Sequence, residues 1–147
     1  MTPAAATAAR PDRDEGTEPF GVLLVAHAPL ASAFARAARK LGMPVDRLAA
    51  LDIEPGMLRR EALASARSLI DPLQCEGWLV LTDLGGCHAT YVLAHAIRQL
   101  PGIQAHVVPG LSMDMLGMAL HHAEGDLASL ALHLAQRGAG GEAARVW

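Results

Sequence analysis

Residues 20–41 read FGVLLVAHAPLASAFARAARKL, and this stretch decides the fold. Residues 22–26 form an apolar run without a charge, which is typical of a strand buried on both faces. Apolar residues recur at helical spacing over residues 30–41, which predicts an amphipathic helix with Pro29 in its first turn. His27 is therefore expected at the carboxyl end of a buried strand, the edge where open parallel sheets bind ligands. A histidine on an ordinary loop is the alternative.

The composition is that of one globular domain of 147 residues, with 52% apolar and 18% charged residues. Aromatic residues make up 3% and the net charge is −3, which argues against both base stacking and binding to a nucleic-acid backbone. The two cysteines are too few for a disulfide framework or a zinc ligand set. No apolar run is long enough to cross a membrane and no signal peptide is evident, so we expect a cytoplasmic protein.

Strand and helix patterns continue to alternate along the chain. Further strands are predicted over residues 45–53, 77–83 and 103–108, and further helices over residues 57–69, 89–100, 112–122 and 126–137. This order predicts an α/β fold, a doubly wound and mainly parallel sheet of four to five strands with helices on both faces. We expect a disordered leader over residues 1–19, the domain over residues 20–137 and a flexible tail over residues 138–147.

Asp83 closes its predicted strand much as His27 closes the first one. Because the carboxyl ends of parallel strands share one edge of a sheet, we expect the two side chains to meet. The carboxylate would then accept a hydrogen bond from one ring nitrogen and leave the other as a nucleophile. It would also stabilise the positive ring that forms during group transfer. No serine or cysteine is clearly placed beside them as a nucleophile, so an esterase is disfavoured.

The loop after Asp83 suggests what would be transferred. Gly85 and Gly86 permit a sharp turn and a close approach to a ligand, and Cys87 and His88 then open a helix whose N–H groups attract anions. We therefore predict that this loop binds a phosphoryl group by positioning and charge stabilisation. An empty glycine turn and a solvated His88 are the alternatives. No metal-ligand spacing is present, so neither a metal nor another cofactor is expected.

Three motifs carry a resemblance to a known family. Residues 22–28 (VLLVAHA), 82–87 (TDLGGC) and 108–116 (VPGLSMDML) resemble, in order and spacing, those of the enzyme IIA component of the mannose-type phosphotransferase system (PTS). The similarity runs from about Phe20 to Gln136. It implies a phosphotransferase of sugar transport that works as a homodimer and without a metal ion.

The resemblance also implies roles for individual residues. His27 would take a phosphoryl group from the phosphocarrier protein HPr and pass it to a IIB protein or domain, while Asp83 orients the ring. Gly85 and Gly86 would face the phosphate. Cys87 and His88 stand where the family commonly has serine and proline, so a hydroxyl is absent while the backbone N–H remains.

Three other functions are weighed against a sugar-transport relay. The first is a free-standing regulatory IIA protein that is not committed to transport, and the second is the phosphotransferase subunit that serves a dihydroxyacetone kinase. The regulatory protein would bind a partner through the rim of the same crevice, whereas the kinase subunit would use the same chemistry of His27. The third, a doubly wound domain that binds a nucleotide or flavin, is disfavoured because the chain has neither a phosphate loop nor a full dinucleotide fingerprint.

Overall fold

The computed structural model describes residues 20–122 and 126–138. The predicted leader lies outside these residues, as does the predicted tail apart from Gly138, which ends a helix. The elements are β1 (Phe20–His27), α2 (Leu30–Lys40), β2 (Leu48–Ile53), α3 (Arg59–Ile70), the short 3-10 helix η1 (Asp71–Leu73), β3 (Gly77–Thr82), α4 (Ala89–Arg98), β4 (Gln104–Pro109), α5 (Met113–His121) and α6 (Leu127–Gly138).

Within the described residues the sheet has four strands in the order β2-β1-β3-β4, and every neighbouring pair is parallel. The predicted fold class is confirmed, and β2 lies at an edge as expected. From β1 the chain first moves outward to β2, then returns across β1 to β3 and continues to β4. The direction of winding therefore reverses between β1 and β3, which is where doubly wound sheets form their binding crevice.

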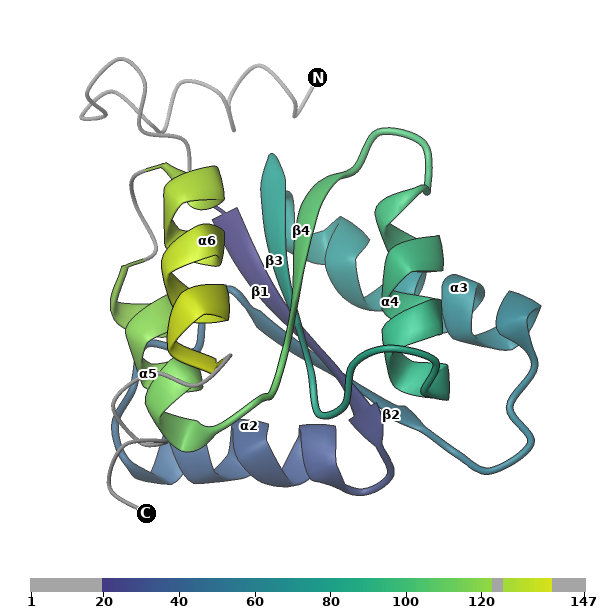
Figure 1. Cartoon of the computed structure of the whole chain (residues 1–147), viewed down its shortest axis with the longest axis horizontal. Helices are drawn as coiled ribbons and strands as arrows, with labels where there is room; N and C mark the ends of the chain where they lie inside the picture. Colours follow the sequence, from purple (N-terminus) through teal and green to yellow (C-terminus); the bar gives the residue numbers. More distant parts are fainter. Residues whose placement is uncertain (1–19, 123–125, 139–147) are drawn as a thin grey trace.

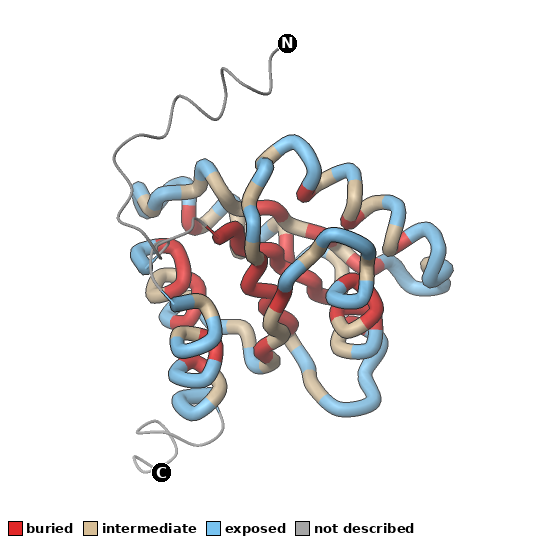
Figure 2. The backbone as a smooth tube through the Cα atoms, turned by 90° about the horizontal axis from the view of Figure 1, so that it is seen from above, coloured by how far each residue is buried: buried red, intermediate tan, exposed pale blue. Residues whose placement is uncertain are grey.

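Helices cover both faces of the sheet (Figure 1). Helices α2, α5 and α6 pack on one face, and α3 and α4 pack on the other. Alternate residues of β1 are divided between these layers, so Val22 and Leu24 face the first group while Leu23 and Val25 face the second. Figure 2 shows the buried residues along the strands and on the inward sides of the helices. Burial on both faces explains why this strand has no polar alternation.

Gly21 marks the closest packing in β1. A Cβ atom at this position would lie 2.5–2.8 Å from three ring atoms of Trp78 on the neighbouring strand β3. Trp78 is itself only 3% exposed, so the ring has little room to move away. Glycine at position 21 is therefore a requirement of the packing between the two central strands.

The start of α2 differs from the prediction. Pro29 is not in the first turn but precedes it, because the helix begins at Leu30. Proline has no side-chain acceptor for the free N–H groups of the first turn, and Asp52 at the end of β2 supplies one instead. The N–H group of Ser32 donates to Oδ1 of Asp52 at 3.1 Å, and the Ser32 hydroxyl donates to the other carboxylate oxygen.

Other boundaries are close to those predicted. Strand β2 starts at Leu48 instead of residue 45, because the N–H of Leu48 turns back to the carbonyl of Val45 at 3.1 Å. Ser112 caps α5 as expected by accepting from the N–H of Met115 at 3.0 Å. Asp126 accepts from the N–H group at position 128 in the first turn of α6, also as expected.

Candidate functional site

The structure brings His27 and Asp83 together at the carboxyl edge of β1 and β3. Nδ1 of His27 lies 2.8 Å from Oδ2 of Asp83, although the two residues are 56 positions apart in the chain. The main-chain N–H of His27 donates to the same oxygen at 3.1 Å. The sheet register explains the meeting, because Thr82, the last residue of β3, lies opposite Val25 near the end of β1. Asp83 therefore emerges beside the end of β1.

The second oxygen of Asp83 is held as well. Oδ1 accepts from the N–H of Leu84 at 3.0 Å and from the hydroxyl of Thr90 at 2.8 Å. Burial by itself raises the pKa of the Asp83 carboxyl, but the hydrogen bonds from the His27 ring, the Thr90 hydroxyl and the His27 main chain outweigh it. Together with the attraction to the ring's charge, they hold the pKa below its ordinary value. Asp83 is therefore a carboxylate near neutral pH.

An ionised carboxylate can only accept hydrogen bonds, so Nδ1 of His27 must carry the proton. The lone pair of the neutral ring is then on Nε2. The side chain of His27 is 44% exposed, whereas that of Asp83 is 12% exposed. The site consequently presents a nucleophilic ring nitrogen at the surface and keeps the carboxylate that orients it shielded.

Thr90 belongs to this constellation and was not among the site residues predicted from the sequence. It is fully buried in the first turn of α4, seven positions after Asp83. One signal was available in the sequence. A threonine is a poor helix former, and here it stands at the start of a helix directly after a glycine turn and an aspartate.

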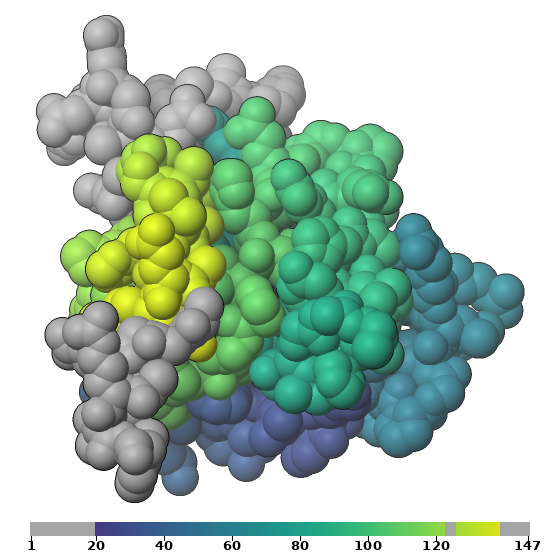
Figure 3. Space-filling model, in the orientation of Figure 1, coloured from purple at the N-terminus to yellow at the C-terminus, as the bar shows by residue number. Residues whose placement is uncertain are grey.

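The glycine turn lies next to this pair, and Figure 3 shows the teal loop after β3 lying against the purple segment where β1 ends and α2 starts. Gly86 has a φ of +66°, the left-handed conformation that favours glycine. Gly85 has a different reason to lack a side chain, because its Cβ would lie 3.1 Å from the Cβ of Pro109. It therefore packs against the end of β4.

Cys87 and His88 are both exposed. They precede α4 instead of opening it, since the helix begins at Ala89 with His88 at the N-cap position. The N–H of His88 is directed back to the carbonyl of Gly85 at 3.4 Å, which closes the turn. Phosphate binding by Gly85, Gly86, Cys87 and His88 stays a prediction.

Across the described ranges 20–122 and 126–138, no group of three or more His, Cys, Asp or Glu side chains is arranged to hold a metal ion. In the same part of the chain, no helix combines the length and the apolar character needed to span a bilayer.

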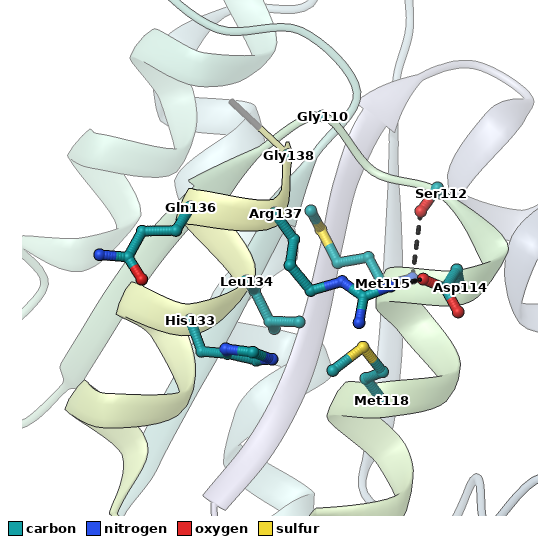
Figure 4. Close-up of a pocket in the computed structure, with 10 residues that line it drawn as sticks. All are labelled: Gly110, Ser112, Asp114, Met115, Met118, His133, Leu134, Gln136, Arg137 and Gly138. Atoms are coloured by element: carbon teal, nitrogen blue, oxygen red, sulfur yellow. Dashed lines mark hydrogen bonds and ion pairs between the residues drawn. The ribbon is translucent and has the colours of Figure 1, made fainter. Parts of the chain in front are cut away.

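A cavity of about 630 Å³ lies between α5 and α6 (Figure 4), and neither His27 nor Asp83 is among the residues that line it. Its walls include Met115, Met118 and polar groups from both helices. Arg137 of α6 reaches across to Asp114 of α5, with an N–O distance of 2.8 Å. Met115 and Met118 thus belong to the packing between these helices and not to the histidine site.

Comparison with known proteins identifies the family of this chain. A family model described as "PTS system fructose IIA component" (EIIA-man) matches residues 21–136. No curated protein matches the chain.

The solved structures that share the fold include three proteins of the phosphotransferase system. The mannose/sorbose-specific IIA subunit from Enterococcus faecalis is 21% identical, with a TM-score of 0.67 over 83% of this chain and 90% of that one. The EIIA component from Streptococcus agalactiae is 18% identical, with a TM-score of 0.65 over 81% and 94%. The IIA protein associated with the fucose utilization operon of Streptococcus pneumoniae is 23% identical, with a TM-score of 0.63 over 82% and 90%.

At these identities the structural likeness establishes the fold alone. The family match covers most of the chain, including β1 and the loop that carries Asp83. This chain therefore belongs to the mannose-type enzyme IIA family of the phosphotransferase system.

Proposed function

We propose that this protein is a phosphoryl carrier in which His27 accepts a phosphoryl group from phosphorylated HPr and passes it to a IIB protein or domain. The observation that carries the proposal is the 2.8 Å contact between Nδ1 of His27 and Asp83, which leaves Nε2 on a partly exposed ring. A carrier needs a nucleophile that a protein partner can reach, and the exposure of His27 meets this need.

The transfer step follows from the tautomer. The lone pair of Nε2 attacks phosphorus while the bond between phosphorus and the donor atom of HPr breaks, and the electron pair leaves on that donor atom. The proton on Nδ1 stays in place, so the ring becomes positively charged as the new bond forms. Asp83 stabilises this charge without taking the proton, as the aspartate of a serine-protease triad does. Transfer to the acceptor reverses these steps.

The loop after Asp83 is proposed to hold the phosphoryl oxygens. Main-chain N–H groups near Gly86 and Cys87 precede the N-terminus of α4, whose dipole favours an anion. This role does not need the side chain of Cys87, since backbone donors suffice. It supports a mechanism by positioning and charge stabilisation.

Phosphorylation of the purified protein by phosphorylated HPr tests the proposal. We expect phosphate that is labile to acid, stable to base and located on His27. The variant His27→Gln should lose the label, while His133→Gln, which changes an exposed histidine on α6, should keep it. The absence of label on the unaltered protein, or label that persists in His27→Gln, would contradict the proposal.

The protein that accepts the phosphoryl group from His27 distinguishes the possible physiological roles. Transfer of the label to a IIB protein supports sugar transport, whereas transfer to a dihydroxyacetone kinase component supports the alternative of a kinase-associated subunit. A stable phosphoprotein that changes its binding to another protein supports a regulatory role. We also propose, from family membership, that the protein is a homodimer, which sedimentation equilibrium tests directly.

A further inference from the structure

We propose that Thr90 is a positioning residue, whose hydroxyl holds Asp83 in the orientation that fixes the tautomer of His27. The predicted effect of Thr90 on phosphoryl transfer rests on the proposed function. The predicted effect of Thr90 on the tautomer of the His27 ring does not depend on that function.

The geometry of the carboxylate carries the argument. One oxygen of Asp83 faces His27, and the other is held by the N–H of Leu84 and the hydroxyl of Thr90. Since an ionised carboxylate only accepts, the Thr90 hydroxyl must be the donor in the 2.8 Å contact. Removing that hydroxyl leaves Oδ1 with the Leu84 N–H alone. The carboxylate is then freer to rotate about its bond to Cβ and to leave the ring.

The distribution of buried polar groups strengthens the assignment. Among the described residues, the buried polar side chains are Thr82 and Thr90, both fully buried. The two hydroxyls bond to adjacent residues of the loop, since that of Thr82 donates to the carbonyl of Leu84 at 2.9 Å and that of Thr90 donates to Oδ1 of Asp83 at 2.8 Å. Burying a hydroxyl is unfavourable unless it is hydrogen-bonded, so each threonine depends on its hydrogen bond to be tolerated in the core. One threonine fixes the backbone of the loop and the other fixes the carboxylate.

The position of Thr90 within α4 gives a second reason. A β-branched residue costs helix stability relative to alanine, and the two other β-branched residues of α4, Val92 and Ile97, carry no hydroxyl. The hydroxyl also connects Asp83 to the helix whose N-terminus borders the glycine turn. Through this bond, the rigid helix sets the position of a side chain that lies on a loop.

The variant Thr90→Val tests the role, because valine keeps the shape of threonine and removes the donor. We expect phosphoryl transfer to His27 to slow about tenfold, a value typical for the loss of one hydrogen bond to a charged group. Thr90→Ser should stay within about threefold of the unaltered protein, because it restores the donor. Thr82→Val is the matched control for the ring spectrum, since it removes an equally buried hydroxyl and keeps all donors to Asp83. It is not a control for the transfer rate, because the Thr82 hydroxyl fixes the backbone of the loop.

A readout that does not depend on stability or on phosphorylation is the ¹⁵N spectrum of the His27 ring. In the neutral ring we expect a single tautomer with the proton on Nδ1 in the unaltered protein, Thr90→Ser and Thr82→Val, and a mixture in Thr90→Val. A Thr90→Val protein with the same ring spectrum and the same transfer rate as the unaltered chain would overturn the proposal.

Two further measurements keep the test decisive. If Thr90→Val does not fold, Thr90→Ala removes the same donor, and the unaltered protein itself should show a slowly exchanging Thr90 hydroxyl proton near Asp83. A hydroxyl proton that exchanges freely with water would overturn the proposal. Should the unaltered protein take no phosphate from HPr, the proposed function fails, while the ring spectra still decide the role of Thr90.

Discussion

The substitution Asp83→Asn tests the constellation at its centre. The carboxylate accepts from four groups: the main-chain N–H and the ring Nδ1–H of His27 on one oxygen, and Leu84 N–H and the Thr90 hydroxyl on the other. An asparagine has one oxygen and one NH₂ group, so it can accept on one side only. Either orientation therefore leaves one main-chain N–H group facing a donor.

The two orientations are not equivalent. With the amide oxygen toward His27, both donors of that residue keep their acceptor, and the Thr90 hydroxyl can turn to accept from the NH₂ group. The N–H that loses its acceptor is then that of Leu84, which is an exposed residue. In the other orientation the lost acceptor belongs to the main chain of His27, and its ring must change tautomer. We expect the first orientation, because water can reach the Leu84 backbone.

The magnitudes follow from this orientation. The unfolding free energy should fall by about 1–3 kcal/mol, the cost of one unsatisfied donor together with weaker bonds to a neutral acceptor. Phosphoryl transfer should slow about 10- to 100-fold, because the positive ring loses its counter-charge but keeps its tautomer. A much larger loss, near 10⁴-fold, accompanies the wrong tautomer in the serine proteases and would indicate the second orientation.

Urea unfolding at neutral pH and rapid-quench transfer from phosphorylated HPr measure the two effects. Asp71→Asn is the matched control, since its side chain is 61% exposed and pairs with Arg67 at 3.5 Å. This control should change the unfolding free energy by less than about 0.5 kcal/mol. The reasoning is refuted if Asp83→Asn unfolds at the same urea concentration as the unaltered protein and is phosphorylated at the same rate.

Three further predictions concern stability. The folded-state pKa of Asp83 lies below its unfolded value of about 3.9. The free energy that the ionised carboxyl contributes to folding is therefore complete above that pH and is lost as the pH falls through the folded-state pKa. Urea unfolding between about pH 6 and pH 3 should show a smaller decrease in unfolding free energy for Asp83→Asn than for the unaltered chain. Asp52→Ala removes the acceptor at the start of α2 and should lower the unfolding free energy by about 1–2 kcal/mol, whereas Ser32→Ala, which keeps the main-chain donor to Asp52, should cost less. Gly21→Ala places a methyl group within 2.5 Å of the Trp78 ring, so we expect about 1–3 kcal/mol of destabilisation and altered tryptophan fluorescence; equal stability would show that the ring has room to move.

Much of the fold could be predicted from local patterns. A continuous apolar run such as residues 22–26 predicts a strand that is covered on both faces. The alternation of such strands with amphipathic helices then predicts a parallel sheet. The same rules place His27 and Asp83 at one edge, because they follow strands that are neighbours in a doubly wound sheet. Resemblance to the enzyme IIA family added the expected chemistry, and the family match confirms the family itself.

The sequence by itself therefore determined the architecture and the edge of the sheet where the site lies, since periodicity and strand order depend on residues close together in the chain. Only the tertiary structure decided that Thr90 secures Asp83, that Asp52 replaces the cap that Pro29 does not provide, and that Gly85 makes room for Pro109. Each of these contacts joins side chains or backbone from different elements. Their geometry depends on how the helices and strands pack against one another, and the local sequence pattern does not specify the distances between elements.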